Sequence, residues 1–194
     1  MPRSSDKTIA AIQEAGFRLF FQRGYARVSM DDIAAEAGVT KRTLYYHFDS
    51  KDTLVGWVVA KQAELSLREA RKWADSGSRS AQDFVDGFFA KLGAWVETPG
   101  WTGSGFTRLT LELADRPGHP VRAAASRHKK SLEAWLAEEL TARGCRSAGT
   151  DAALIATLVE GATLLALIHS DPGYVRQARL AATQILSNGF NQSR

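Results

Sequence analysis

The run of 25 residues from Val28 to Asp52 most constrains the fold, because it contains two short helical patterns joined by a glycine. The first pattern starts after Ser29 and ends before Gly38, where we expect a tight turn with positive φ. The second starts after Thr40, which is a good helix N-cap. Helices this short are not stable alone in water, so they must pack against each other and against a neighbouring helix.

Three cations lie where helices are expected to start: Lys41, Arg42 and Lys51. The N-terminus of a helix already carries partial positive charge, so each cation costs about 0.3–1 kcal/mol near the surface. An external anion would offset this cost, and the phosphate backbone of DNA is the obvious candidate. No carboxylate that would repel DNA occurs between Val39 and Phe48.

Two helices joined by a short glycine turn form a helix-turn-helix, whose second helix enters the major groove of DNA. Residues at the start of that helix reach base edges most easily, so we expect Lys41, Arg42 and Thr43 to read the sequence. Lys51 would bind a phosphate together with the free N–H groups of the next helix. The alternative is a structural motif with solvated charges. The predicted DNA-contacting residues are Thr40, Lys41, Arg42, Thr43, Tyr45, Tyr46, His47 and Lys51, of which the last four would hold the backbone.

The spacing of apolar residues predicts helices along almost the whole chain and no strand of useful length, which is an all-α fold. The helices are expected over 7–23, 29–37, 40–48, 50–73, 84–96, 106–113, 121–140, 151–168 and from 171 onward, with loops over 75–80, 98–105 and 116–120.

Composition permits a DNA-binding function without establishing it. The net charge of the 194 residues is +4, and residues 1–52 carry eight Lys or Arg against seven Asp or Glu, so DNA affinity must come from local placement. The single cysteine, Cys145, excludes an intrachain disulfide and fits a reducing cytoplasm. We expect no signal peptide and no membrane span, because the most apolar stretch, 152–168, is short and contains Glu160.

The first quarter of the chain resembles the TetR family of bacterial transcriptional regulators. The resemblance rests on three segments: Leu19-Phe-(x3)-Gly24-Tyr25, Ile33-Ala34-(x2)-Ala37-Gly38-Val39 and Thr43-Leu44-Tyr45-Tyr46-His47-Phe48-(x2)-Lys51-(x2)-Leu54. It implies about nine helices, with a helix-turn-helix domain over 1–52 and a helical effector-binding and dimerisation domain over 53–194. It also implies a homodimer in which Thr43, Tyr45, His47 and Lys51 contact DNA. One departure is Phe21, at a position that the family often fills with a smaller or polar residue.

The second part of the chain carries the tryptophans and most phenylalanines, so we expect an apolar effector pocket there. For any single aromatic residue, and for His128 on an apolar stripe, a place in the core is the alternative. No zinc spacing, cofactor fingerprint or Ser/His/Asp set is present, so we expect no metal, no cofactor and no catalytic residues. The predicted pocket residues are Trp57, Phe88, Trp95, Trp101, Phe106, Thr110, His128 and Trp135.

The segment 151–168 is apolar on nearly all sides, so we expect the helix to be buried all round, partly by a second copy of the chain. The alternative is a core within one chain. The predicted dimer-interface residues are Leu154, Leu158, Ala162, Leu165, Ala178, Ala182 and Ile185.

Together these features favour a ligand-responsive repressor. It would bind a palindromic, double-stranded operator as a homodimer and be released by a small, mostly apolar effector. The alternative is a DNA-binding protein controlled by a protein partner or without an effector. An enzyme is not expected.

Overall fold

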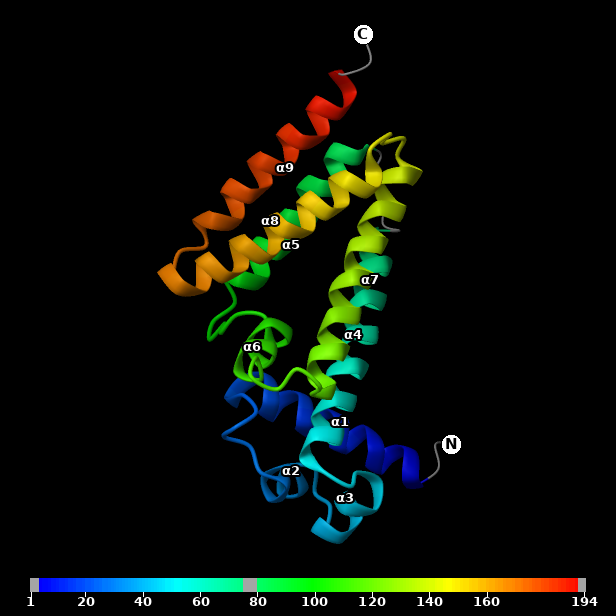
Figure 1. The fold of residues 1–194 in the computed structure, drawn as a ribbon, viewed down its shortest axis with the longest axis vertical. Coiled ribbons are helices and arrows are strands. Elements are labelled where there is room, and N and C mark those ends of the chain that lie inside the picture. Colours follow the sequence, from blue (N-terminus) through cyan, green and yellow to red (C-terminus); the bar gives the residue numbers. More distant parts are fainter. Residues whose placement is uncertain (1–3, 75–79, 192–194) are drawn as a thin grey trace. The chain divides into compact units, whose positions relative to one another are not determined.

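The computed structural model describes residues 4–74 and 80–191, which form nine α-helices and no strand (Figure 1). The predicted all-α fold is therefore confirmed for the described part of the chain. The loop expected over 75–80 lies, apart from Ser80, outside the described residues. The helices are α1 Ser4–Arg23, α2 Met30–Glu36, α3 Lys41–His47, α4 Lys51–Ala74, α5 Ala81–Val96, α6 Gly105–Glu112, α7 Pro120–Ala142, α8 Ala148–His169 and α9 Gly173–Asn191.

The chain divides into two compact units. Unit 1 comprises Met1–Ser66 and Gly105–His128, and unit 2 comprises Leu67–Ser104 and Lys129–Arg194. Unit 1 is larger than the DNA-binding domain expected over 1–52, because α6 and the start of α7 bury apolar side chains in the same core as α1 to α4. The domain boundary after residue 52 stays a prediction.

Local signals set the ends of the short helices as expected. Ser29 and Asp32 form a capping box at α2, in which the Ser29 side chain accepts the Asp32 N–H and the Asp32 side chain accepts the Ser29 N–H. Thr40 caps α3 by accepting the Thr43 N–H at 3.1 Å. Gly38 turns the chain between the two helices with φ +65°, a conformation that favours glycine.

Unit 1 has one apolar core that fixes the two short helices. Ile33 of α2 and Leu44 of α3 are fully buried, together with Ile12 of α1 and Leu54 of α4. Burying a side chain of this size contributes about 1.5–3 kcal/mol. The position of α3 therefore depends on this core rather than on the stability of the helix alone.

Phe21 fills a space that only a glycine leaves open. Its ring packs against Phe17 at 4.6 Å and edge-to-face against Phe106 at 5.3 Å, measured between ring centroids. A Cβ atom on Gly105, the first residue of α6, would lie 2.1 Å from Phe21 Cδ1. The large residue at position 21 is thus matched by the absence of a side chain at position 105.

Gly105→Ala is therefore expected to lower the free energy of unfolding by about 1–3 kcal/mol, because the added methyl group must displace the Phe21 ring. Urea unfolding followed by circular dichroism measures this change. Gly149→Ala is the control. It also replaces a helical glycine by alanine, but a Cβ atom at position 149 meets no atom within 4 Å. Equal unfolding midpoints for the two variants would contradict this account of Phe21.

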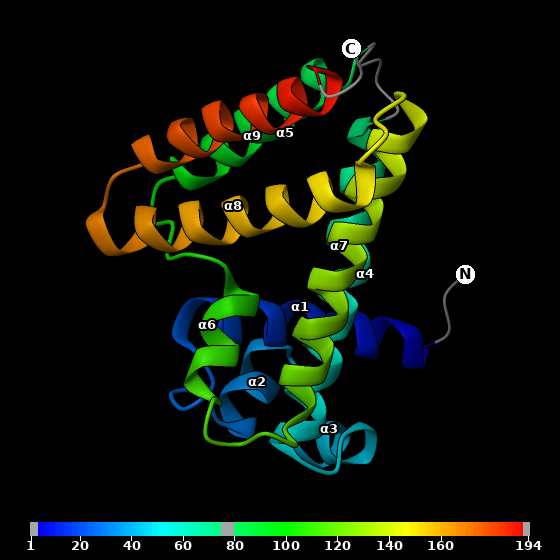
Figure 2. The same cartoon turned by 45° about the horizontal axis from the view of Figure 1, so that its top comes forward.

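In unit 2, α5, α8 and α9 lie side by side in both views (Figures 1 and 2). One face of α8 is buried in the core through residues such as Ile155 and Val159. Its other face is exposed in the single chain, which does not fit the alternative of a core within one chain; burial of that face by a second copy stays a prediction. Length and apolar composition alone would allow α8 to cross a membrane, a property that it shares with core helices of soluble proteins.

The exposed face of unit 2 carries large apolar side chains on two helices. Ile168 of α8 is 62% exposed and Leu180 of α9 is 65% exposed. Of the predicted interface residues, Ala162, Ala178 and Ala182 are buried in the core of the chain itself, and their part in a dimer interface stays a prediction. The exposed apolar face consists of Leu154, Leu164, Leu165, Ile168 and Leu180.

Candidate nucleic-acid interface

Helix α3 has one buried side and one exposed side. Leu44 is fully buried and Phe48, the C-cap, is nearly so. Tyr46 on the opposite side is 83% exposed, more than any other large apolar side chain among the described residues. An aromatic side chain so exposed, on a helix without carboxylates, fits a surface that contacts another molecule.

The eight residues predicted to contact DNA lie on α3, at its N-cap and at the first residue of α4. Five of them are exposed and three are partly exposed. The hydroxyl of Thr40 is engaged in the cap, where it also lies 2.8 Å from the hydroxyl of Thr43. Their contacts with DNA stay a prediction. The exposed residues are Thr40, Lys41, Arg42, Tyr45 and Tyr46, and the partly exposed ones are Thr43, His47 and Lys51.

Two of the three cations at helix starts have partners within the chain. Lys41 Nζ lies 2.8 Å from Asp31 Oδ1 of α2, and the hydrogen bond to Asp31 raises the pKa of Lys41. Lys51 Nζ lies 4.0 Å from the centroid of the Tyr25 ring. An external anion is therefore not required to explain these two. For Arg42, no ion pair is seen with any residue that the structure describes.

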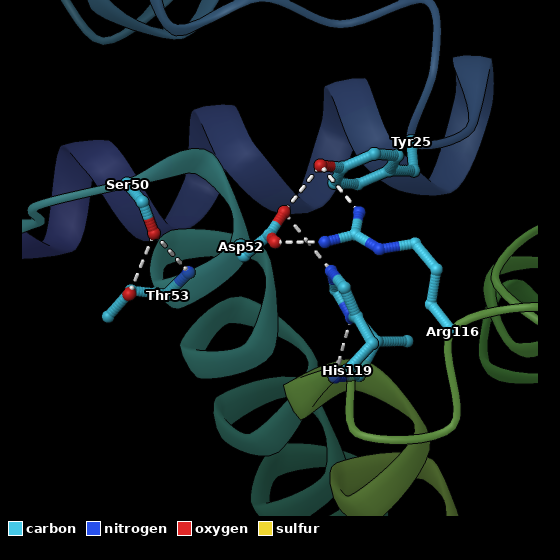
Figure 3. A network of polar contacts seen from close by, with 7 residues as sticks. Tyr25, Ser50, Asp52, Thr53, Arg116 and His119 are labelled. Atoms are coloured by element: carbon cyan, nitrogen blue, oxygen red, sulfur yellow. Dashed lines mark hydrogen bonds and ion pairs between the residues drawn. The ribbon is translucent and has the colours of Figure 1, made fainter.

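A polar cluster surrounds Tyr25, the second residue after α1 (Figure 3). The Tyr25 hydroxyl donates to Asp52 Oδ1 and accepts from Arg116 Nη1 at 3.2 Å. Arg116 Nη2 also donates to Asp52 Oδ2, and His119 Nε2 lies 3.2 Å from Asp52 Oδ1. The cluster thus joins the end of α1, the start of α4 and the segment between α6 and α7, all within unit 1.

This cluster could not be predicted from the sequence. Arg116 and His119 were assigned only to a break between helices, and Tyr25 only to a family segment. Nothing in the sequence pattern indicates a contact between residues 64 positions apart, as in the pair Arg116 and Asp52.

A second contact fixes the backbone next to Tyr25. The two carboxylate oxygens of Glu112, at the end of α6, accept the N–H groups of Tyr25 and Ala26, each at 2.7 Å. A carboxylate that accepts two backbone N–H groups makes a strong, directional contact. The chain between α1 and α2 is therefore held by α6 as well as by the side chains of the cluster.

The cluster lowers the pKa of Asp52 to about 2. Burial acts in the opposite direction, but the hydrogen bonds from Tyr25, Arg116 and His119 stabilise the ionised carboxylate more than burial destabilises it. The pKa of Tyr25 is raised, first by burial and then by the hydrogen bond to Asp52. The phenol therefore remains protonated and the carboxylate ionised across the physiological range.

This shift predicts a contribution to stability that depends on pH. Because the folded pKa of Asp52 is below its unfolded value of 3.8, the contribution is fully present above pH 3.8 and is lost as the pH falls towards 2. We expect about 1–2 kcal/mol, since partial exposure reduces the effect. Urea unfolding between pH 2 and 5 should show a steeper loss of stability for the wild type than for Asp52→Asn. Parallel pH profiles would contradict the assignment.

The predicted effector-pocket residues are divided between the two units. Trp57, Phe106, Thr110 and His128 belong to unit 1, whereas Phe88, Trp95, Trp101 and Trp135 belong to unit 2. Their rings form separate contacts, measured between ring centroids. In unit 1, Phe106 lies 3.9 Å from His128, and Trp57 lies 5.0 Å from Phe48. In unit 2, Phe88 lies 6.1 Å from Trp135, and Trp95 lies 5.5 Å from Trp101.

Three of these residues are buried in the chain. Trp135 is fully buried, and its indole N–H donates to Glu139 Oε1 at 3.1 Å. Phe106 and His128 are buried and stacked on each other. Thr110 uses its hydroxyl to donate to the backbone oxygen of Phe106 at 2.8 Å. In the single chain these burials fit core packing, the alternative stated for them above, and a role of Trp135, Phe106 and His128 in an effector pocket stays a prediction.

A cavity of about 240 Å³ is present between α5 and α9 within unit 2. It is open to solvent on one side, and none of the predicted pocket residues lines it. Its walls are formed by Phe89, Ala90, Gly93, Ala94, Glu97, Pro172, Val175, Arg176 and Arg179.

Comparison with known proteins extends these observations. Residues 12–56 match the sequence model of the family described as bacterial regulatory proteins, tetR family. The chain is 29% identical over 141 residues to an uncharacterised HTH-type transcriptional regulator from Haemophilus influenzae, covering 70% of this chain and 64% of that protein. It is 47% identical over 83 residues to the HTH-type transcriptional regulator TtgR from Pseudomonas putida, covering 42% of this chain and 36% of TtgR. The chain thus spans less than two thirds of either relative.

Solved structures match over nearly the whole chain. A TetR-family transcriptional regulator from Streptomyces coelicolor superposes with a TM-score of 0.78 at 27% identity, covering 94% of this chain and 96% of that one. Reduced NemR from E. coli shares the fold, with a TM-score of 0.81 at 20% identity over 90% of this chain and 94% of its own. The matching helix-turn-helix segment, the nine helices of the described residues and these likenesses agree: residues 12–56 match the tetR family of bacterial regulatory proteins, and the described chain shares the fold of TetR-family regulators of known structure.

Proposed function

We propose that the protein represses transcription by binding a palindromic, double-stranded operator as a homodimer, and that a small, mostly apolar effector releases it. The observation that carries the proposal is the exposed side of α3, which presents Arg42, Tyr45 and Tyr46 to solvent while Leu44 anchors the helix in the core. This is the arrangement that a recognition helix needs to enter a major groove.

The side chains of α3 and α4 suggest separate roles in the complex. Arg42, at the second position of α3, is long enough to donate two hydrogen bonds to guanine O6 and N7. Tyr45, Tyr46 and His47 are further from the helix start and suit contacts with sugar and phosphate. Lys51, at the first position of α4, adds a charge where the free N–H groups of that helix already attract a phosphate.

A dimer is supported by the exposed apolar face of unit 2, formed by Leu154, Leu164, Leu165, Ile168 and Leu180. Large apolar side chains gathered on two adjacent helices typically mark a protein interface. Two-fold symmetry would bring α8 and α9 of one protomer against the same helices of its partner. The two recognition helices would then occupy successive major grooves, about 34–36 Å apart.

An effector site is supported by the aromatic side chains of unit 2 that remain partly exposed. Trp95 at the end of α5 is half-exposed and contacts the Trp101 ring edge-to-face. The indole N–H of Trp101 is buried without an acceptor among the described residues. An apolar effector with one acceptor atom would suit this pair, and it regulates DNA binding only if it binds the two states of the protein with different affinity.

Selection of DNA from a random pool by the full-length protein tests the proposed function. We expect enrichment of a sequence with two-fold symmetry and an affinity that falls steeply with salt, because phosphate contacts release counterions. Compounds that raise the melting temperature should then be screened for release of the selected DNA. Failure to enrich any sequence, with salt-independent binding, would contradict the DNA-binding function.

A further inference from the structure

The ammonium group of Lys51 has a defined resting place on the face of an aromatic ring. Its Nζ lies 4.0 Å from the centroid of Tyr25, within the range of a cation–π contact. Lys51 is also the first residue of α4, where a cation is disfavoured by the partial positive charge of the helix end. The Tyr25 ring therefore fixes a side chain that would otherwise sample many rotamers.

The Tyr25 ring is itself held by residues outside the helix-turn-helix. The Tyr25 hydroxyl contacts Asp52 and Arg116. The ring of His119 packs edge-to-face against the Tyr25 ring, with 5.4 Å between the ring centroids. Arg116 comes from the segment between α6 and α7, so a residue 91 positions away in sequence determines where the hydroxyl points. Glu112 fixes the backbone of the same tyrosine.

His119 supports this arrangement through both ring nitrogens. Its Nδ1 accepts the backbone N–H of Val121 at 3.2 Å, so the ring proton lies on Nε2, which faces Asp52. The imidazole is fully buried. Asp52 is thus held between Tyr25, Arg116 and His119.

From these contacts we propose that Arg116 and Tyr25 are positioning residues for DNA binding. Through the Tyr25 ring they hold the Lys51 ammonium at the start of α4, from where it binds an operator phosphate. This inference rests on the proposed function. Immobilising a lysine side chain on binding carries an entropic cost. Because the Tyr25 ring already orders the Lys51 side chain in the free protein, less entropy is lost when DNA binds. Arg116 therefore acts on the phosphate contact without touching the DNA.

A double-mutant cycle on the full-length protein tests the inference, using the operator selected as above and fluorescence anisotropy across a salt series. Lys51→Gln should weaken binding about 10-fold and reduce the slope of log K against log salt by about 0.9, the value for one lost phosphate contact. Arg116→Gln should weaken binding about 5-fold. The double variant should bind within about 2-fold of Lys51→Gln, because both changes remove the same contact.

Two further variants separate positioning from charge and from folding. Arg122→Gln also removes an arginine charge from this region, but Arg122 donates to the backbone oxygen of Ala114 and makes no contact with Tyr25 that the structure shows, so binding should change less than 2-fold. Tyr25→Phe keeps the ring and removes only the hydroxyl. Tyr25→Phe should weaken binding about as much as Arg116→Gln. The double variant should bind about as well as either single variant, because both changes release the same tyrosine ring.

The outcomes distinguish this inference from the proposed function. If the effects of Arg116→Gln and Lys51→Gln multiply and the salt slope of the double variant falls by about 1.8, Arg116 contacts a phosphate directly and the inference is overturned. The inference is also overturned if the wild type binds the operator and both Arg116→Gln and Tyr25→Phe bind it with the same affinity as the wild type. If the wild type binds no DNA, the proposed function fails instead. Circular dichroism of each variant confirms that the compared proteins are folded.

Discussion

Arg42→Ala is expected to weaken operator binding by about 1–3 kcal/mol, which is roughly 5- to 150-fold, and to relax the sequence preference at one base pair of each half-site. Arg42 is exposed at the second position of α3, and the described residues show no ion pair that would hold it away from DNA. Its neighbour Lys41 is paired with Asp31, so binding through Lys41 must first break that contact.

Anisotropy titrations on the selected operator and on base-substituted versions measure both effects. Arg68→Ala is the matched control, because Arg68 is an exposed arginine of α4 that belongs to unit 2. The control should bind like the wild type and keep its preference at every position. If Arg42→Ala and Arg68→Ala have the same affinity and preference, α3 does not read bases through Arg42.

Ile168→Glu combined with Leu180→Glu is expected to convert the dimer into monomers and to lower operator affinity by more than about 100-fold. Both side chains are more than half exposed in the single chain, so the substitutions leave the core intact. In a dimer, however, each would bury a charge in place of an apolar side chain that contributes about 1.5–3 kcal/mol. Both symmetric copies of the face carry the change, which doubles its effect.

Sedimentation equilibrium gives the dissociation constant of the dimer, and the same samples can be titrated with operator. Leu111→Glu is the control, because Leu111 is 60% exposed on α6 in unit 1, whereas the proposed interface helices belong to unit 2. It should remain dimeric. A double variant that stays dimeric, or a wild type that is monomeric at all concentrations, would refute the proposed interface.

The helix-turn-helix could be predicted from the sequence because its determinants are local. Ser29 and Thr40 cap the helices next to them, and Gly38 adopts the turn conformation that its missing side chain allows. The alternation of buried and exposed positions around Leu44 then fixes which side of α3 faces solvent. The identification of these three elements therefore needed no knowledge of the rest of the chain.

The body of the chain was less predictable because apolar periodicity does not say what covers each side of a helix. The sequence of α8 is apolar all round, and the small residues Ala162, Ala178 and Ala182 turn out to serve contacts within the chain. The larger Leu154 and Leu165, also predicted, lie on the exposed face. Apolar composition therefore identified the helices, but not which of their residues are buried within the chain and which are exposed.

The polar cluster shows a second limit of sequence reasoning. Cations at helix starts suggested an external anion, but Lys41 and Lys51 have partners that come from other helices or loops. Such contacts depend on tertiary structure and leave no periodic signal. Of the three cations at helix starts, only Arg42 is seen without an ion pair or ring contact among the described residues.

Methylation interference on the selected operator tests most directly whether α3 reads the major groove. Methylation at guanine N7 places a group in the major groove, where it blocks contact with an inserted side chain. We predict interference at guanines in two major-groove segments about one helical turn apart, on the same face of the DNA. Binding that is insensitive to guanine methylation, or interference confined to a single segment, would contradict a dimer that reads DNA through α3.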